Sequence, residues 1–216
     1  MKILIATGMR REAKLMEGPG LNVIAGGGDG PRLERELETH SLDAGLILSS
    51  GLAGALDPKL MVGDIVIDGP TALVEQLLAA LPEAHAGPVK GSDFPIASVA
   101  AKSEMRREGA AAVDMESHIA RRVAARHGVP CLVARVISDR ADQALPPAAL
   151  AGMKPDGGIA LGAVLGSLVR NPGQLPALVR TGRDAQIALR VLGRLHHVLR
   201  GGGIGGLDLR ELALDV

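Results

Sequence analysis

Short apolar runs, separated by glycine, proline and charged residues, recur along the chain. Runs of strand length that are rich in Ile, Leu and Val occupy residues 3–6, 21–25, 44–49, 60–67 and 131–134. Continuous apolar runs of this length are typical of strands covered on both faces. The pattern therefore predicts several buried strands.

Segments with helical spacing of apolar residues lie between these runs. They occupy residues 32–40, 73–81, the stretch up to 108, the stretch before Gly128, and 159–169. Gly128 and the proline two residues later predict the end of one helix, since glycine supplies a left-handed cap and proline cannot continue the helix. Alternating strands and helices favour the α/β class.

After residue 143 the chain changes character. Residues 144–158 are rich in proline, glycine and alanine, and residues 184–200 show a cleanly amphipathic helical pattern. Residues 157–206 carry six arginines and one acid. Such a helix packs on its own domain, forms a subunit interface, or lies on an anionic membrane surface. The pattern does not choose among the three.

Composition narrows the class of protein. With 216 residues the chain can bury one substantial core, and we expect an α/β domain over residues 1–156 with a helical extension, residues 157–216, packed on it. The net charge of zero gives no reason to expect nucleic acid as a partner. A single cysteine fits a reducing cytoplasm, and no uncharged run reaches the length of about 20 residues that spans a bilayer.

Residues 111–143 hold the densest candidate chemistry. A helix, a buried strand and a charged segment that includes Arg135, Ser138 and Asp139 follow one another there. In open α/β sheets, ligands bind outside the carboxyl ends of the strands. These side chains are therefore candidates for a ligand site.

Four segments resemble the nucleoside phosphorylase and nucleosidase superfamily, in the branch of methylthioadenosine/S-adenosylhomocysteine nucleosidase. They are V-D-M-E-S, A-R-V-I-S-D-R-A-D-Q, the opening strand with its following loop, and the strand, glycine turn and V-G-D-I-V of residues 46–67. The opening T-G-M-R-R-E-A-K, the A-G-G-G-D after it and the C-terminal stretch are most similar to the hopanoid-associated phosphorylases. The resemblance implies a three-layer α/β/α fold with a central mixed, twisted sheet.

The resemblance also implies roles for individual residues. Asp139 would assist the departing purine at N7, with Ser138 positioning it, and Glu116 would hold the ribose hydroxyls. Met115 and Met9 would line the sugar pocket.

Phe94 is the only aromatic residue of the chain, and it matches the phenylalanine that stacks on the base in this family. A purine offers a flat apolar face, so a lone aromatic at this position favours stacking over a place in the core.

The residues alone do not decide whether water or phosphate attacks the sugar. Glu12 matches the base that activates water in nucleosidases, whereas a carboxylate repels a phosphate dianion. The candidates for holding phosphate or water are Gly8, Arg10, Arg135 and Ser50. The arginines and the narrower resemblance favour phosphate.

The sequence thus predicts an enzyme that releases adenine from a 5′-substituted adenosine, by phosphorolysis with inorganic phosphate as co-substrate and without a metal or other cofactor. The resemblance implies adenosylhopane as substrate. The alternatives are a hydrolytic nucleosidase and a non-enzymatic membrane-associated assembly module. We further expect a cytoplasmic homo-oligomer with peripheral contact at the inner membrane surface, acting on a small-molecule or lipid-linked nucleoside.

Overall fold

A computed structural model describes residues 2–152, 154 and 157–200. Residue 156, which ends the expected α/β domain, and residues 201–216 of the expected extension lie outside the described residues. In the described part the strands form one sheet; their bounds are β1 (Lys2–Thr7), β2 (Leu21–Ala25), β3 (Ala44–Ala55), β4 (Ile65–Asp68), β5 (His85–Ala86), β6 (Val89–Gly91), β7 (Ala112–Asp114) and β8 (Cys131–Asp139). The helices are α1 (Arg10–Met16), α2 (Gly30–Ser41), α3 (Thr71–Ala80), α4 (Val99–Arg107), α5 (Ser117–His127), α6 (Pro147–Ala151), α7 (Leu161–Arg170) and α8 (Leu175–Val198), with a short 3-10 helix, η1 (Pro172–Gln174), before α8.

The sheet is mixed, as expected. Its main order is β2-β1-β3-β8-β4-β5, in which β8 and β4 are antiparallel and the other neighbours are parallel. β7 joins β3 in antiparallel fashion, and β6 pairs with β7. The long strands β3 and β8 lie side by side at the centre, so the carboxyl ends of β1, β3 and β8 meet at one edge.

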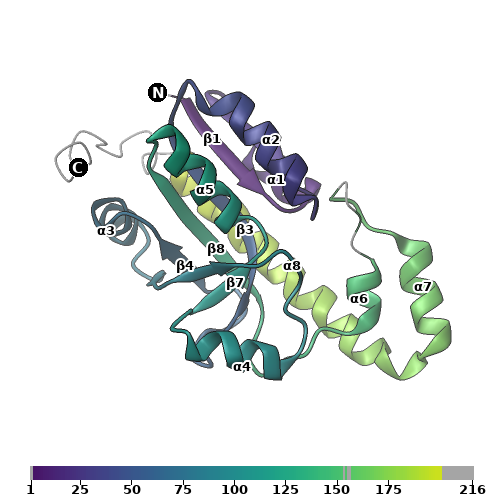
Figure 1. Cartoon of the computed structure of the whole chain (residues 1–216). Coiled ribbons are helices and arrows are strands. Elements are labelled where there is room, and N and C mark those ends of the chain that lie inside the picture. The colour runs from purple at the N-terminus through teal and green to yellow at the C-terminus, as the bar shows by residue number, and fades with distance from the viewer. Residues whose placement is uncertain (1, 153, 155–156, 201–216) are drawn as a thin grey trace.

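Helices cover both faces of the sheet, which gives the three layers that the sequence predicts (Figure 1). On one face, α3 and α8 pack against leucines and isoleucines of β1, β3 and β4. On the other face, α2 and α5 pack against the alternate residues of β1 and β3. The alternation of side chains along each strand explains how a continuous apolar run serves both layers.

The strand expected over residues 60–67 is shorter in the structure. β4 begins at Ile65, because Gly63 adopts a φ of 96° and Asp64 Oδ2 accepts a hydrogen bond from the Met61 N–H at 2.8 Å. These contacts make a turn of the residues before Ile65. The glycine turn expected after residue 49 is instead part of β3, which continues to Ala55.

The apolar face predicted for residues 184–200 is buried against the sheet. Ala188, Leu192 and Leu195 have no exposed surface, and Leu199 is 2% exposed. In the structure this face therefore packs on the domain and is not available to lipid. The helix also begins earlier than expected, at Leu175, with Pro176 in its first turn.

Cys131 opens β8 and is partly buried. Burial raises the pKa of its thiol to about 12. The thiol is therefore protonated at neutral pH. In the described part of the chain, no helix is both long and apolar enough to cross a membrane.

Candidate active site

The candidate residues gather where the carboxyl ends of the parallel strands meet. The loop after β1 supplies Gly8 and Met9, and α1 begins with Glu12 in its first turn. Glu116 follows β7 at the cap position of α5. The end of β8 supplies Asp139. Segments that are far apart in the sequence thus contribute to one edge of the sheet.

Glu12 is buried and held by three backbone N–H groups. Its Oε2 accepts hydrogen bonds from Gly8 N at 2.9 Å and Met9 N at 2.7 Å, and its Oε1 accepts one from Leu52 N at 2.9 Å. Burial raises the pKa of this carboxyl above its ordinary value, although the Met9 amide and Arg135 act in the opposite direction. Glu12 is therefore a fixed carboxyl group with an increased tendency to take up a proton.

Glu116 faces Glu12 across the backbone of Gly8. A Cβ atom at Gly8 would lie 2.7 Å from Glu116 Oε1 and 3.3 Å from Glu12 Oε2. Burial raises the pKa of Glu116 to about 8, with Asp114 and Glu12 adding to the rise and Arg135 opposing it. Only a residue without a side chain fits between the two carboxyl groups.

Arg135 lies beneath these carboxyl groups and has no exposed surface. Its NH2 nitrogen is 2.6 Å from Asp114 Oδ2 and donates a hydrogen bond of 2.6 Å to Ser49 Oγ. Its NH1 nitrogen is 3.3 Å from Glu116 Oε2. The guanidinium thus compensates a cluster of buried carboxylates.

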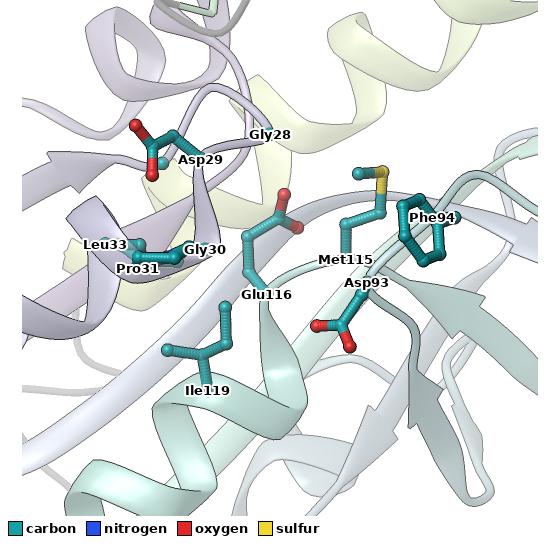
Figure 2. A pocket seen from close by; sticks show the side chains of 11 residues that line it. Gly28, Asp29, Gly30, Pro31, Leu33, Asp93, Phe94, Met115, Glu116 and Ile119 are labelled. Atoms are coloured by element: carbon teal, nitrogen blue, oxygen red, sulfur yellow. The ribbon is translucent and has the colours of Figure 1, made fainter.

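A cavity of about 390 Å³ opens beside Glu116. Figure 2 shows the Glu116 carboxyl pointing between the loop of Gly28 and Asp29 on one side and Met115 and Phe94 on the other. The remaining lining residues are Gly26, Gly30, Pro31, Leu33, Asp93 and Ile119. The structure therefore brings three of the predicted residues, Phe94, Met115 and Glu116, to one cavity.

Phe94 stands at the rim of this cavity with 76% of its surface exposed. Its backbone is tied to Ser92, whose hydroxyl donates a hydrogen bond of 2.8 Å to Phe94 O. A side chain this exposed contributes little to the core. The ring is instead available to a ligand.

Asp139 is buried next to the end of β3, outside the lining of the 390 Å³ cavity. Its Oδ1 accepts a hydrogen bond of 2.9 Å from Ser138 Oγ, as the expected positioning role of Ser138 requires. A Cβ atom at Gly54 would lie 3.0 Å from its Oδ2. The same Oδ2 forms an ion pair with Lys102 Nζ.

Lys102 was not predicted from the sequence. It is 1% exposed, and its ammonium also donates hydrogen bonds to Arg140 O at 2.7 Å and Gln143 O at 3.0 Å. The three acceptors use all three donors of the ammonium. The ion pair compensates the charge of the buried Asp139 and fixes the loop that follows β8.

Neither Ser50 nor Arg10, which were both predicted to bind phosphate or water, lines the cavity beside Glu116. Ser50 is fully buried and lies two residues after Leu48, so it faces α8, whereas Ser49 faces Arg135. The Ser50 hydroxyl has no hydrogen-bond partner among the described residues. Arg10 is exposed, and its backbone N–H donates a hydrogen bond of 3.3 Å to Gly157 O.

The arrangement has the parts that glycosyl transfer requires. It offers a fixed carboxyl group for activating a nucleophile, a second carboxyl group in a cavity, and an aromatic ring at the rim. Among the described residues, no group of three or more His, Cys, Asp and Glu side chains is placed to hold a metal ion.

The protein has an α/β fold that is similar to the folds of solved nucleosidases. The 5′-methylthioadenosine/S-adenosyl homocysteine nucleosidase of Campylobacter jejuni matches 90% of this chain and 99% of its own, with 19% identity and a TM-score of 0.57. The corresponding enzyme of Helicobacter pylori matches 90% and 97%, with 17% identity and a TM-score of 0.60. The futalosine hydrolase of Helicobacter pylori matches 90% and 97%, with 18% identity and a TM-score of 0.60.

Residues 69–155 match the model of the phosphorylase superfamily. This segment contains Phe94, Glu116, Arg135 and Asp139, but not Glu12. No curated protein matches the chain. Together with the fold, the family match confirms the resemblance to the nucleoside phosphorylase and nucleosidase superfamily.

Proposed function

We propose that the chain cleaves the N-glycosidic bond of a purine nucleoside and releases the base. The observation that carries this proposal is the pair of buried carboxyl groups, Glu12 and Glu116, on either side of Gly8 and beside a cavity rimmed by Phe94. Structural neighbours that are named as nucleosidases and hydrolases of nucleosides support it.

In this proposal each carboxyl group has its own task. Phe94 stacks on the base, and Asp139, held by Ser138 and Lys102, binds the base on its N7 side and assists its departure. Glu116 binds the ribose hydroxyls, and once it has lost the proton that its raised pKa of about 8 favours, its carboxylate stabilises positive charge that develops on the sugar. Glu12 activates the group that attacks the sugar.

We propose water as the attacking group, in place of the phosphate that the sequence favours. The three backbone N–H groups that donate to Glu12 could bind an anion such as phosphate, but the Glu12 carboxyl already occupies them. With the Glu12 carboxyl in this position, a phosphate dianion would meet a buried acid instead of free donors. Arg135 is likewise engaged by Asp114 and Glu116.

Phosphorolysis stays the second candidate because Arg10 and Arg11 lie exposed at the start of α1, directly before Glu12. Protonation of Glu12, which its raised pKa favours, would lessen the repulsion of phosphate.

We propose a 5′-substituted adenosine as substrate, and adenosylhopane as the particular substrate that the narrower resemblance implies. The loops that follow α1 and β4 are short in the structure, since β2 starts at Leu21 and α3 at Thr71. Loops of this length leave room for a bulky group at the sugar.

The test is a chromatographic assay of adenine release from adenosine, 5′-methylthioadenosine and 5′-alkylated adenosines, each with and without phosphate. We expect adenine and a free ribose derivative at rates independent of phosphate, and no release by the Glu12→Gln variant. Phosphate-dependent formation of a ribose 1-phosphate would contradict hydrolysis but support the cleavage itself. No release from any of these nucleosides would contradict the proposed function and favour the non-enzymatic alternative.

A further inference from the structure

Helix α7 carries an apolar face that no described residue covers. Leu161, Leu165 and Val169 recur at helical spacing and are 70%, 62% and 84% exposed, and Ile159 just before the helix is 54% exposed. Figure 1 shows α6 and α7 extending beyond the sheet, beside the first half of α8. This apolar face, formed by Ile159, Leu161, Leu165 and Val169, is the α7 face.

The opposite side of α7 is packed, so the orientation of the helix is fixed. Gln174, which is 7% exposed, donates hydrogen bonds from Nε2 to Ser167 O at 2.8 Å and to Ser167 Oγ at 3.0 Å. Its Oε1 accepts a hydrogen bond of 2.8 Å from Ala148 N in α6. A buried polar side chain thus joins α6, α7 and η1 and leaves the α7 face directed outward.

The segment that carries the α7 face is basic as far as Arg183, after which Asp184 follows. Residues 157–183 contain three arginines and no acid. Arg170 ends α7, Arg180 and Arg183 lie in the first half of α8, and all three are exposed. An apolar helix face with arginines beside it is typical of helices that lie in the interface of a membrane with anionic lipids.

A second copy of the chain fits this surface less well. A stable interface buries about 800 Å² on each partner, more than four apolar side chains on one short helix supply. In a symmetric pair the same patch meets itself, and residues 157–183 contain no acid that could compensate the arginines of the other copy. An anionic lipid surface instead complements the charge.

The chain that enters α7 also touches the candidate active site. Gly157 O accepts the hydrogen bond from the Arg10 N–H. Gly157 has a φ of 75°, and a Cβ atom there would lie 3.0 Å from Arg10 N and 3.3 Å from Gly8 O. The chain that leads into the α7 face is therefore in contact with the backbone of Gly8, which separates Glu12 and Glu116.

We propose that the α7 face docks the protein on an anionic membrane surface, with Ile159, Leu161, Leu165 and Val169 among the lipid headgroups and the exposed Arg170 attracted to the lipid phosphates. This inference does not depend on the proposed function, because it concerns lipid binding and not turnover.

The test is cosedimentation of the full chain with phosphatidylcholine vesicles that contain or lack phosphatidylglycerol. We expect binding that requires phosphatidylglycerol and weakens with salt. The Leu165→Ser/Val169→Ser variant should bind the vesicles at least about tenfold more weakly, because two apolar side chains no longer enter the membrane interface. Leu42→Ser is the matched control, since Leu42 is 82% exposed outside α7, and it should bind as the unchanged chain does.

The Arg170→Gln variant should bind the anionic vesicles with a weaker salt dependence while keeping the fold, which melting curves would verify. Absence of binding to the anionic vesicles would overturn the proposal, and so would equal binding by Leu165→Ser/Val169→Ser and the unchanged chain. A dimer of the unchanged chain that dissociates in the Leu165→Ser/Val169→Ser variant would also overturn it, because a second copy would then cover the α7 face.

Discussion

Lys102 of α4 and Asp139 at the end of β8 form an ion pair that is almost completely buried, with the lysine 1% and the aspartate 6% exposed. The lysine also holds the carbonyl groups of Arg140 and Gln143. Removing one partner of a buried ion pair leaves an uncompensated charge, which costs more free energy than the pair itself contributes. Asp139, which is proposed to assist the departure of the base, is therefore held in place by Lys102 of α4, a helix that carries no other candidate residue.

We expect the Lys102→Met variant to lose about 3 to 5 kcal/mol of unfolding free energy, because Asp139 would remain buried without its cation. Denaturant unfolding measures the loss. The Lys102→Met/Asp139→Asn variant should be less destabilised than Lys102→Met alone, since no charge is then left unpaired. If the losses of unfolding free energy from the two single substitutions simply added up in the double variant, Lys102 and Asp139 would not stabilise each other.

Asp139→Asn should lower turnover of adenine nucleosides by about 100-fold to 10,000-fold, the usual contribution of general acid–base catalysis. The fold should persist at reduced stability, because the buried Lys102 loses its counter-charge but keeps its bonds to Arg140 O and Gln143 O. Turnover is measured as adenine release, and circular dichroism verifies the fold. Near-normal turnover by the folded variant would exclude Asp139 from this role.

Phe94→Leu should raise KM while leaving stability within about 0.5 kcal/mol, because the ring is 76% exposed and packs on little of the protein. Steady-state kinetics and denaturant unfolding measure the two effects. Phe94→Tyr is the matched control, since it keeps an aromatic face and should keep KM. An unstable Phe94→Leu variant with unchanged KM would identify Phe94 as a structural residue.

The raised pKa of Glu116 predicts how stability depends on pH. Its pKa is about 8 in the folded protein and near 4.5 when unperturbed. Between these values the folded state binds the proton and the unfolded state does not, so the free energy of unfolding should fall as pH rises from about 5 to about 8. In Glu116→Gln this part of the fall should be absent, and melting temperatures across the pH range measure it. An identical pH dependence in both proteins would contradict the assignment.

The sequence pattern predicted the α/β class and the resemblance implied its three layers, but neither predicted the ends of the central strands. Ser49, Ser50 and Gly51 interrupt the apolar run of β3, and Arg135 interrupts that of β8. Hydrophobic pattern alone therefore ends both strands too early. The polar residues fit inside the sheet because Arg135 pairs with Asp114 and Ser49, contacts between segments that no local pattern reveals.

The candidate site residues that could be predicted are those that match the motifs of the superfamily. They include Glu12, Glu116, Phe94 and Asp139, whereas Lys102 lies in a polar, charged helix where a lysine usually faces solvent. Its burial depends on the loop after β8, which closes over it only in the folded chain.

The two amphipathic C-terminal segments illustrate the same limit. Both have an apolar face by sequence, yet the face of α8 at Leu192 and Leu195 is buried, and that of α7 at Leu165 is exposed. Periodicity identifies which residues share a face, but only tertiary packing decides whether the protein itself covers that face.

The single thiol of the chain, Cys131, has a practical consequence for labelling. With its pKa raised to about 12, it has almost no thiolate at neutral pH and reacts slowly with maleimides and methanethiosulfonates. A cysteine introduced at Leu165, which is 62% exposed, would therefore take up a spin label or a dye selectively, without prior removal of Cys131. The surroundings of α7 can then be followed by spectroscopy in the otherwise unmodified chain.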